Sequence, residues 1–152
     1  MTRELRTGWG ARVVVLGGGR LDSIGSWIAE LDRAIPTSGV AVGGLLMDFR
    51  AHPFAPSAEE AGALLDRLRA RFRATVPPVA AVARPGGQFG GTRVLCTLAE
   101  MHGCRASAFL TEAEAWLWLR AQLQGQAVAP LGGSNGDGEQ RIPDTMAGGG
   151  GA

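Results

Sequence analysis

The sequence contains no lysine and no tyrosine, and only two of its 152 residues are cysteine. Two thiols, Cys96 and Cys104, provide neither a disulfide framework nor a full set of structural zinc ligands, so we expect both to be buried and reduced. No apolar run approaches the roughly 18 residues that cross a bilayer, and residues 1–6 lack the apolar stretch of a secretory signal. The composition therefore predicts a cytoplasmic protein with no membrane span.

A strong charge of either sign is also lacking. All 15 basic residues are arginine, 14 acidic residues balance them, and the net charge is +1. A general nucleic-acid binder usually shows a pI above about 9, so the charge does not indicate nucleic acid as a partner. The chain is instead rich in glycine, with 24 residues, and its length is typical of one domain with a single core.

Residues 125–152 differ in composition from the rest of the chain. Large apolar side chains are few there, and the segment ends in consecutive glycines at 148–151. Such a segment cannot bury enough apolar surface to offset the entropy cost of ordering it. We therefore predict a folded domain over 1–124 and a flexible, glycine-rich tail over 125–152.

Within 1–124, short apolar runs bounded by glycine or proline alternate with segments of helical periodicity. The runs 12–16, 45–49, 79–82 and 105–110 are predicted as strands, with a further antiparallel strand at 5–9. The segments 24–35, 58–72, 89–102 and 112–124 are predicted as helices. The pairs Ser57 with Glu60 and Thr111 with Glu114 have the spacing of capping boxes before two of these helices.

Alternation of strands and helices is typical of parallel sheets, because consecutive parallel strands need a crossover connection. The predicted fold class is α/β, with a mainly parallel or mixed four- to five-stranded sheet and four helices. The alternative is an all-helical bundle. It would require the β-branched and apolar runs between glycines and prolines to be something other than strands.

The order of elements and four short motifs resemble the STAS-like domains. The motifs are Gly19-Arg20-Leu21-Asp22, Leu46-Met47-Asp48-Phe49-Arg50, Phe89-Gly90-Gly91-Thr92-Arg93 and Glu114-Ala115-Trp116-Leu117-Trp118-Leu119. That family is similar in fold to the bacterial anti-sigma-factor antagonists and to lipid-binding CRAL-TRIO-type domains. The resemblance covers roughly residues 10–120 and speaks to fold more than to activity. It implies a signalling or sensing domain without chemistry of its own, used in partner switching or small-ligand sensing.

The antagonist proteins carry an Asp-Ser-Ser-Gly turn after the strand that bears an aspartate, and a partner kinase phosphorylates a serine in that turn. Counting on from Asp48, this sequence has Pro56-Ser57-Ala58-Glu59 at the corresponding place. The aspartate, the second serine and the glycine are all missing. Ser57 is therefore a candidate phosphorylation site on one interpretation and an ordinary helix N-cap on the other.

Three arginines each follow a predicted strand within a few residues, and the helix 89–102 begins beside them. In a parallel sheet these positions gather at the carboxyl edge, where open α/β sheets bind their ligands. Guanidinium and aromatic groups together suit a small anionic or amphiphilic ligand, or the carboxylates of a protein partner. The alternative is that these arginines only solvate loop ends. The predicted ligand-binding residues are Arg20, Arg50, Arg84, Gln88, Phe89 and Arg93.

Few residues suggest catalysis. The two histidines, His52 and His102, lie in different elements, and Cys96 lies in mid-helix, away from the positive helix end that lowers a thiol pKa. We therefore predict no enzymatic activity, no metal site and no cofactor. The alternative is a small enzyme or nucleotide-binding domain that uses the glycine turn at 17–19. The dinucleotide fingerprint is incomplete there, because the next glycine is Gly25 and no acidic residue follows about twenty positions on.

The predicted last helix has more apolar side chains than one face can bury. Trp116 and Trp118 lie on opposite shoulders of its apolar stripe, and Leu117 points away from it. We therefore predict a protein contact or a homodimer through Trp116, Leu117 and Trp118. The alternative is that this helix packs beneath the N-terminal segment that contains Trp9.

Overall fold

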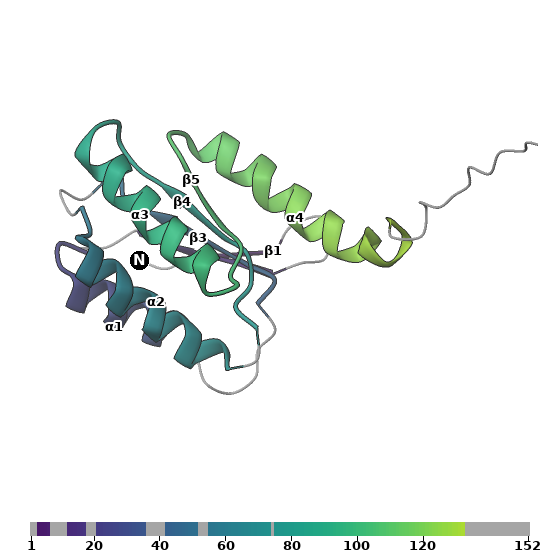
Figure 1. The fold of residues 1–152 in the computed structure, drawn as a ribbon, viewed down its shortest axis with the longest axis horizontal. Coiled ribbons are helices and arrows are strands. Elements are labelled where there is room, and N and C mark those ends of the chain that lie inside the picture. Colours follow the sequence, from purple (N-terminus) through teal and green to yellow (C-terminus); the bar gives the residue numbers. More distant parts are fainter. Residues whose placement is uncertain are drawn as a thin grey trace, which may run out of the picture.

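The computed structural model describes residues 3–6, 12–17, 21–35, 42–51, 55–73 and 75–132, and their side chains except at 3–6 and 126–132. Strands β2 (Arg12–Leu16), β3 (Gly44–Asp48), β4 (Val79–Val82) and β5 (Ala106–Phe109) run parallel, and β1 (Arg3–Arg6) is antiparallel to β2. The strands follow one another across the sheet in sequence order (Figure 1). The predicted α/β class with a mainly parallel sheet is confirmed.

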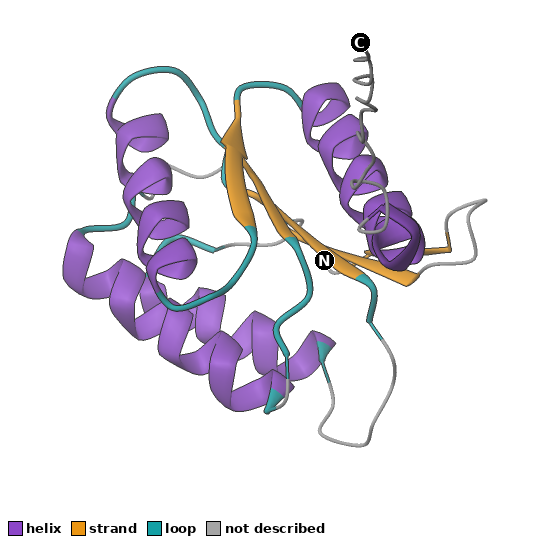
Figure 2. Ribbon diagram, turned by 45° about the vertical axis from the view of Figure 1, so that its right-hand side comes forward, coloured by secondary structure: helices purple, strands orange, loops and turns teal. Residues whose placement is uncertain are grey.

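Four helices are present in the described part of the chain: α1 (Ile24–Ala34), α2 (Ala58–Phe72), α3 (Gly87–Met101) and α4 (Glu112–Gly132). The first three connect neighbouring parallel strands. Because such crossovers are almost always right-handed, all three pack on the same face of the sheet. Helix α4 follows β5 and covers the opposite face (Figure 2).

Each face of the sheet has its own apolar layer, because successive side chains of a strand point to opposite faces. On the α1–α3 face, Val14, Leu45 and Met47 pack against the buried stripes of the helices. On the α4 face, Val13, Leu46 and Val82 pack against Ala115 and Leu119 of α4. The sheet is therefore buried on both sides, as its continuous apolar runs indicate.

Most predicted elements are present with small shifts of their ends. Strand β4 has the predicted bounds, and the predicted stripe of α2 is buried at Ala61, Leu64, Leu65 and Leu68. The antiparallel strand lies at Arg3–Arg6 and not at 5–9. Helix α4 continues to Gly132, past the predicted end at 124 and into the segment predicted as a tail.

Side chains cap three of the helices at their N-termini. The hydroxyl of Ser57 accepts a hydrogen bond from the amide of Glu60, whose carboxylate accepts one from the amide of Ser57, both at 3.1 Å, so the predicted capping box is present. Thr111 accepts from the amide of Glu114 at 3.2 Å. A second complete box, between Ser23 and Ser26 at the start of α1, was not predicted from the sequence.

Within the described residues, no helix combines the length and the apolar character that a membrane crossing requires.

Candidate functional site at the carboxyl edge of the sheet

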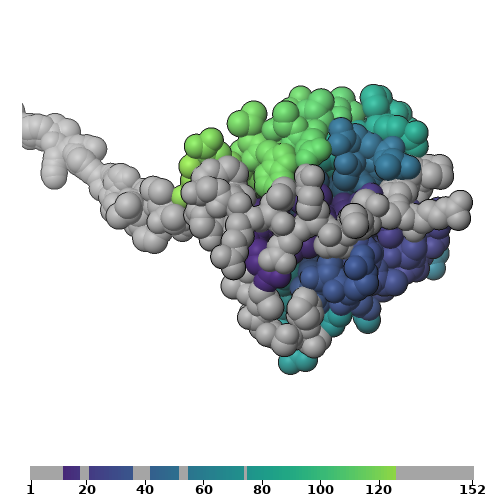
Figure 3. Space-filling model, turned by 180° about the vertical axis from the view of Figure 1, so that it is seen from behind, coloured from purple at the N-terminus to yellow at the C-terminus, as the bar shows by residue number. Residues whose placement is uncertain are grey.

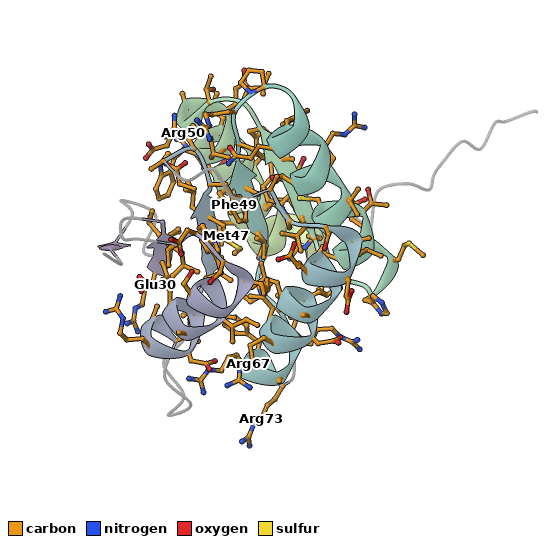
Figure 4. The ribbon with its side chains drawn as sticks, turned by 90° about the vertical axis from the view of Figure 1, so that its left-hand side faces the viewer. Glu30, Met47, Phe49, Arg50, Arg67 and Arg73 are labelled. Carbon is orange, nitrogen blue, oxygen red and sulfur yellow. The ribbon has the colours of Figure 1, made fainter. Side chains whose placement is uncertain are left out.

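The ends of β3 and β4 bring two of the predicted arginines to one edge. Asp48 is in register with Val82, and two residues further on the chain reaches Arg50 after β3 and Arg84 after β4. Figure 4 shows Arg50 at this end of the molecule and Arg73 at the other, with Met47 and Phe49 between them. Arg20 lies outside the described residues. The topology thus gives Arg50 and Arg84 a common edge, as parallel strands require.

The guanidinium of Arg50 is held by two carboxylates. Its Nε and Nη2 donate to the two oxygens of Asp48 at 2.9 and 2.8 Å, and Nη2 also donates to Glu112 at the start of α4, at 3.2 Å. The fork-to-fork bond with Asp48, followed by the charge of Glu112, raises the pKa of Arg50. Two negative groups therefore neutralise this arginine, and it joins β3 to α4.

Gln88 connects two strand ends from inside the protein. Gln88 is only 7% exposed. Its side-chain nitrogen Nε2 donates to the backbone carbonyl of Phe49 at 2.9 Å. Its side-chain oxygen Oε1 accepts from the backbone amide of Arg84 at 2.8 Å. A buried amide with both ends bonded fixes the relative position of the groups it joins. Gln88 therefore positions the chain that carries Arg84 and does not itself present a polar group to a ligand.

A buried aromatic pair supports the same edge from below. The indole of Trp27 donates to the carbonyl of Leu21 at 3.1 Å, and its ring lies 4.5 Å from that of Phe49, centroid to centroid. Both side chains are completely buried. This packing of Phe49 against Trp27 fixes the position of the chain at the end of β3.

Arg84 stands at the point where the chain changes faces. After β4 the chain enters α3 on one face of the sheet, whereas after β5 it enters α4 on the other. Crevices at the carboxyl edge form where neighbouring strands lead to opposite faces. The residues from Arg84 to Gly87 border this point and are all exposed.

Helix α3 begins beside Arg84 without a side-chain cap, because its N-cap is Gly86 with a φ of +99°. A Cβ atom built on Gly86 or Gly87 would meet no atom within 4 Å, so the space outside this turn is open. Of the other two predicted ligand residues on α3, Phe89 is half-buried and Arg93 is exposed. Arg93 lines a groove between α3 and β5.

The glycine turn after β2 has a packing explanation. Gly17 has a φ of +135°, and a Cβ atom there would lie 2.4 Å from the carbonyl oxygen of Asp48. The backbone at the end of β2 therefore approaches the end of β3 too closely for any side chain. The other two glycines of the turn, at 18 and 19, lie outside the described residues.

Ser57 is an exposed helix N-cap, and its hydroxyl is used in the capping box. Two acidic residues, Glu59 and Glu60, occupy the first turn of α2. They already interact favourably with the positive end of the helix dipole.

The candidate nucleophiles and metal ligands are dispersed. Burial raises the pKa of the Cys96 thiol to about 12, and Cys104 is also buried. His102 is exposed at the end of α3, and His52 lies outside the described residues. In the described part of the chain, no three His, Cys, Asp or Glu side chains form a metal-binding group.

The outer face of α4 carries one of the three predicted contact residues. Leu117 is 68% exposed, and α4 forms one side of the surface in the view from behind (Figure 3). The two tryptophans are half-buried. Trp116 donates to Glu112 at 3.2 Å, and the ring of Trp118 lies 5.8 Å from that of Phe109.

A hollow of about 510 Å³ lies at the opposite end of the sheet and is bordered by Arg69, Arg73 and His102. These side chains stand in the last turns or at the ends of α2 and α3. Positive charge is favoured there by the helix dipoles, which accounts for the cations of this hollow.

Sequence reasoning missed Glu112 as a partner of Arg50, because 62 residues separate them. It also missed the pairing within Asp48-Phe49-Arg50, although the spacing of two places both side chains on the same side of an extended chain.

Comparison of the chain with family models, curated proteins and solved structures found no match.

Proposed function

We propose that this protein is a non-catalytic, STAS-like binding domain that works in signalling or sensing. Its carboxyl edge receives the carboxylates of a protein partner or the head of a small anionic amphiphile. The observation that carries this proposal is the exposed Arg84 after β4, beside the start of α3, which no side chain caps. A helix N-terminus and a guanidinium both favour negative charge.

The roles of the predicted residues differ within this proposal. Arg84 is the contact, since its side chain is exposed beside the start of α3, whereas Arg50 bridges Asp48 and Glu112 and holds β3 to α4. Gln88 holds the backbone of Arg84 in place, and the half-buried ring of Phe89 supplies apolar surface beside it. The open space outside Gly86 allows a carboxylate or a phosphate to approach the backbone.

A second contact of this domain is the outer face of α4. An exposed leucine between two half-buried tryptophans gives that helix an apolar centre, to which a protein partner can bind. No observation in the described residues favours the alternative of a nucleotide site at the glycine turn, because Gly17 is explained by its approach to Asp48.

The test is an NMR titration of the ¹⁵N-labelled protein with inorganic phosphate, with laurate and with an acidic hexapeptide. We expect the amide signals of Gly86, Gly87 and Phe89 to shift with at least one probe, and the apparent affinity to fall on the order of tenfold in Arg84→Gln. Arg105→Gln is the matched control. It removes the same charge from a side chain that bonds Gln122 on α4.

Equal titrations of wild type and Arg84→Gln would refute the proposed site. ADP is added as a fourth probe. Shifts that are confined to the residues around Gly17 and are seen with ADP alone would favour the nucleotide-binding alternative.

A further inference from the structure

Strand β5 is an outer strand of the sheet in the described part of the chain. It pairs with β4 on one side: the amide of Val79 donates to the carbonyl of Arg105 at 2.9 Å, and that of Ala83 to the carbonyl of Phe109 at 3.0 Å. Hydrogen-bonding groups alternate along a strand, so the groups of Ala106 and Ala108 point away from β4. Unlike many outer strands, β5 carries no charged residue and no proline.

Helix α3 lies over β5, and the two border a groove of about 190 Å³. Arg93 stands towards one end of the groove and Glu100 towards the other, two helical turns apart, with Thr97 between them. Both charged side chains are exposed. Because α3 runs against the direction of β5, the middle of this helix segment lies beside Ser107.

The outer surface of α3 carries both an apolar hollow and an exposed apolar side chain that could fill such a hollow. A shallow hollow of about 350 Å³ is bordered by Gly90, Arg93, Val94, Thr97 and Leu98. Met101, one turn beyond this hollow on the same helix, is 75% exposed. A methionine of this exposure fits well into an irregular apolar hollow.

We propose that β5 and α3 form a self-complementary surface through which two copies of this chain pair. The two β5 strands meet antiparallel about a twofold axis near Ser107, which extends the sheet from five strands to ten across the pair. This interface goes beyond the proposed function and does not depend on it. It uses a different edge from the α4 contact described above.

One axis satisfies the backbone, the charges and the apolar side chains together. Antiparallel pairing about Ser107 sets Ala106 opposite Ala108 of the second copy, so the outward groups of both residues find partners. The same axis passes near Thr97 and sets Arg93 of each copy opposite Glu100 of the other. Met101 of each copy then faces the hollow beside Val94 of the other. Such an interface is isologous, because each element meets its own counterpart.

Charge reversal provides a sharp test by sedimentation equilibrium of the full chain. We expect wild type to be dimeric, and Arg93→Glu and Glu100→Arg each to raise the dimer dissociation constant by on the order of tenfold or more through like-charge contacts. In the double variant R93E/E100R the opposite charges face each other again. Its dissociation constant should return to within about threefold of wild type.

Two control variants show whether the effect is specific to this interface. Arg69→Glu reverses an exposed charge on α2, and α3 separates α2 from the proposed interface at β5. This variant should leave the dissociation constant unchanged. Leu117→Glu alters the outer face of α4 and should also have no effect on this dimer. Far-UV circular dichroism confirms that each variant is folded.

The proposal is overturned if wild type is monomeric, if the double variant fails to recover, or if Leu117→Glu dissociates the dimer while the charge reversals do not. None of these results bears on the proposed ligand site at Arg84. The NMR titrations of wild type and Arg84→Gln report on the carboxyl edge of the sheet, whereas this dimer forms along strand β5. The two proposals therefore stand or fall separately.

Discussion

Gly17 determines how closely the ends of β2 and β3 approach each other. A Cβ atom at this position would lie 2.4 Å from the carbonyl oxygen of Asp48, and the φ of +135° is strained for any other residue. We expect Gly17→Ala to lower the free energy of unfolding by about 2–3 kcal/mol, measured by urea denaturation.

Gly62 is the matched control for that substitution. It lies within α2, and a Cβ atom there would meet no atom within 4 Å. Gly62→Ala should raise the free energy of unfolding by about 0.5–1 kcal/mol, because alanine loses less backbone entropy on folding. If both substitutions changed stability in the same direction, the close approach at Gly17 would not be the reason for its glycine.

Ser57 illustrates a residue whose structural role can be measured apart from any modification. Ser57→Ala removes the acceptor of the Glu60 amide and should cost about 1 kcal/mol in thermal or chemical unfolding. Ser57→Asp keeps an acceptor and should stay within about 0.5 kcal/mol of wild type, because aspartate is an equally good N-cap. A loss of equal size in both variants would show that the missing hydrogen-bond acceptor is not its cause. The candidate phosphorylation is a separate question, tested by kinase treatment and mass spectrometry.

At the scale of elements, an ion-pair cluster joins α1 to α2. Asp32 of α1 accepts from Nε of Arg67 at 2.7 Å and pairs with Nε of Arg71 at 3.1 Å, both on α2. The hydrogen bond from Arg67, together with the charges of both arginines, outweighs partial burial and lowers the pKa of Asp32. The exposed part of this cluster is screened by water and salt.

A lowered pKa makes the contribution of Asp32 depend on pH in a definite direction. It is fully present above the unfolded-state pKa of about 3.9 and is lost as the pH falls through the lower folded-state value. Asp32→Asn should therefore be less stable than wild type at pH 7, and the difference should shrink below about pH 4. Asp66→Asn, on the exposed side of α2, is the control. A difference that stays constant down to pH 2 would contradict this account.

Sequence patterns predicted the bounds of an element well where residues that cannot continue it, such as proline, stand directly beside it. The run at β4 is bounded by Pro78 and by Arg84-Pro85, and its predicted bounds are those observed. The predicted end of α4 at 124 was wrong. The apolar content falls after Gln124, but the helix continues to Gly132. Composition reports on burial, and it does not by itself fix the residue at which a helix ends.

The candidate site was predictable only in part, for a related reason. Parallel strand direction was enough to place Arg50 and Arg84 at one edge. The pairing of Arg50 with Glu112, and the two bonds of Gln88, depend on which face α3 and α4 occupy. That choice follows from strand order and crossover handedness across the sheet, which no single segment contains.

At the scale of the whole molecule, the two faces of the sheet differ in how they are covered. Three helices share one face, whereas in the described part of the chain α4 alone covers the other, through Ala115 and Leu119. Both layers use the same strands, so loss of either exposes the sheet that supports the other. We therefore expect one cooperative unfolding transition, with circular dichroism and tryptophan fluorescence giving the same midpoint.

Two leucines of α4 test this dependence with the same substitution on one helix. Leu119 is fully buried against the sheet, so Leu119→Ala leaves a cavity and should cost about 2–4 kcal/mol. Leu117 is 68% exposed, so Leu117→Ala should change stability by no more than about 0.5 kcal/mol. If Leu119→Ala instead separated the fluorescence midpoint from the circular-dichroism midpoint, α4 would unfold independently, and the three-helix face would hold the sheet without it. Equal, small effects of both substitutions would mean that α4 contributes little to the stability of the fold.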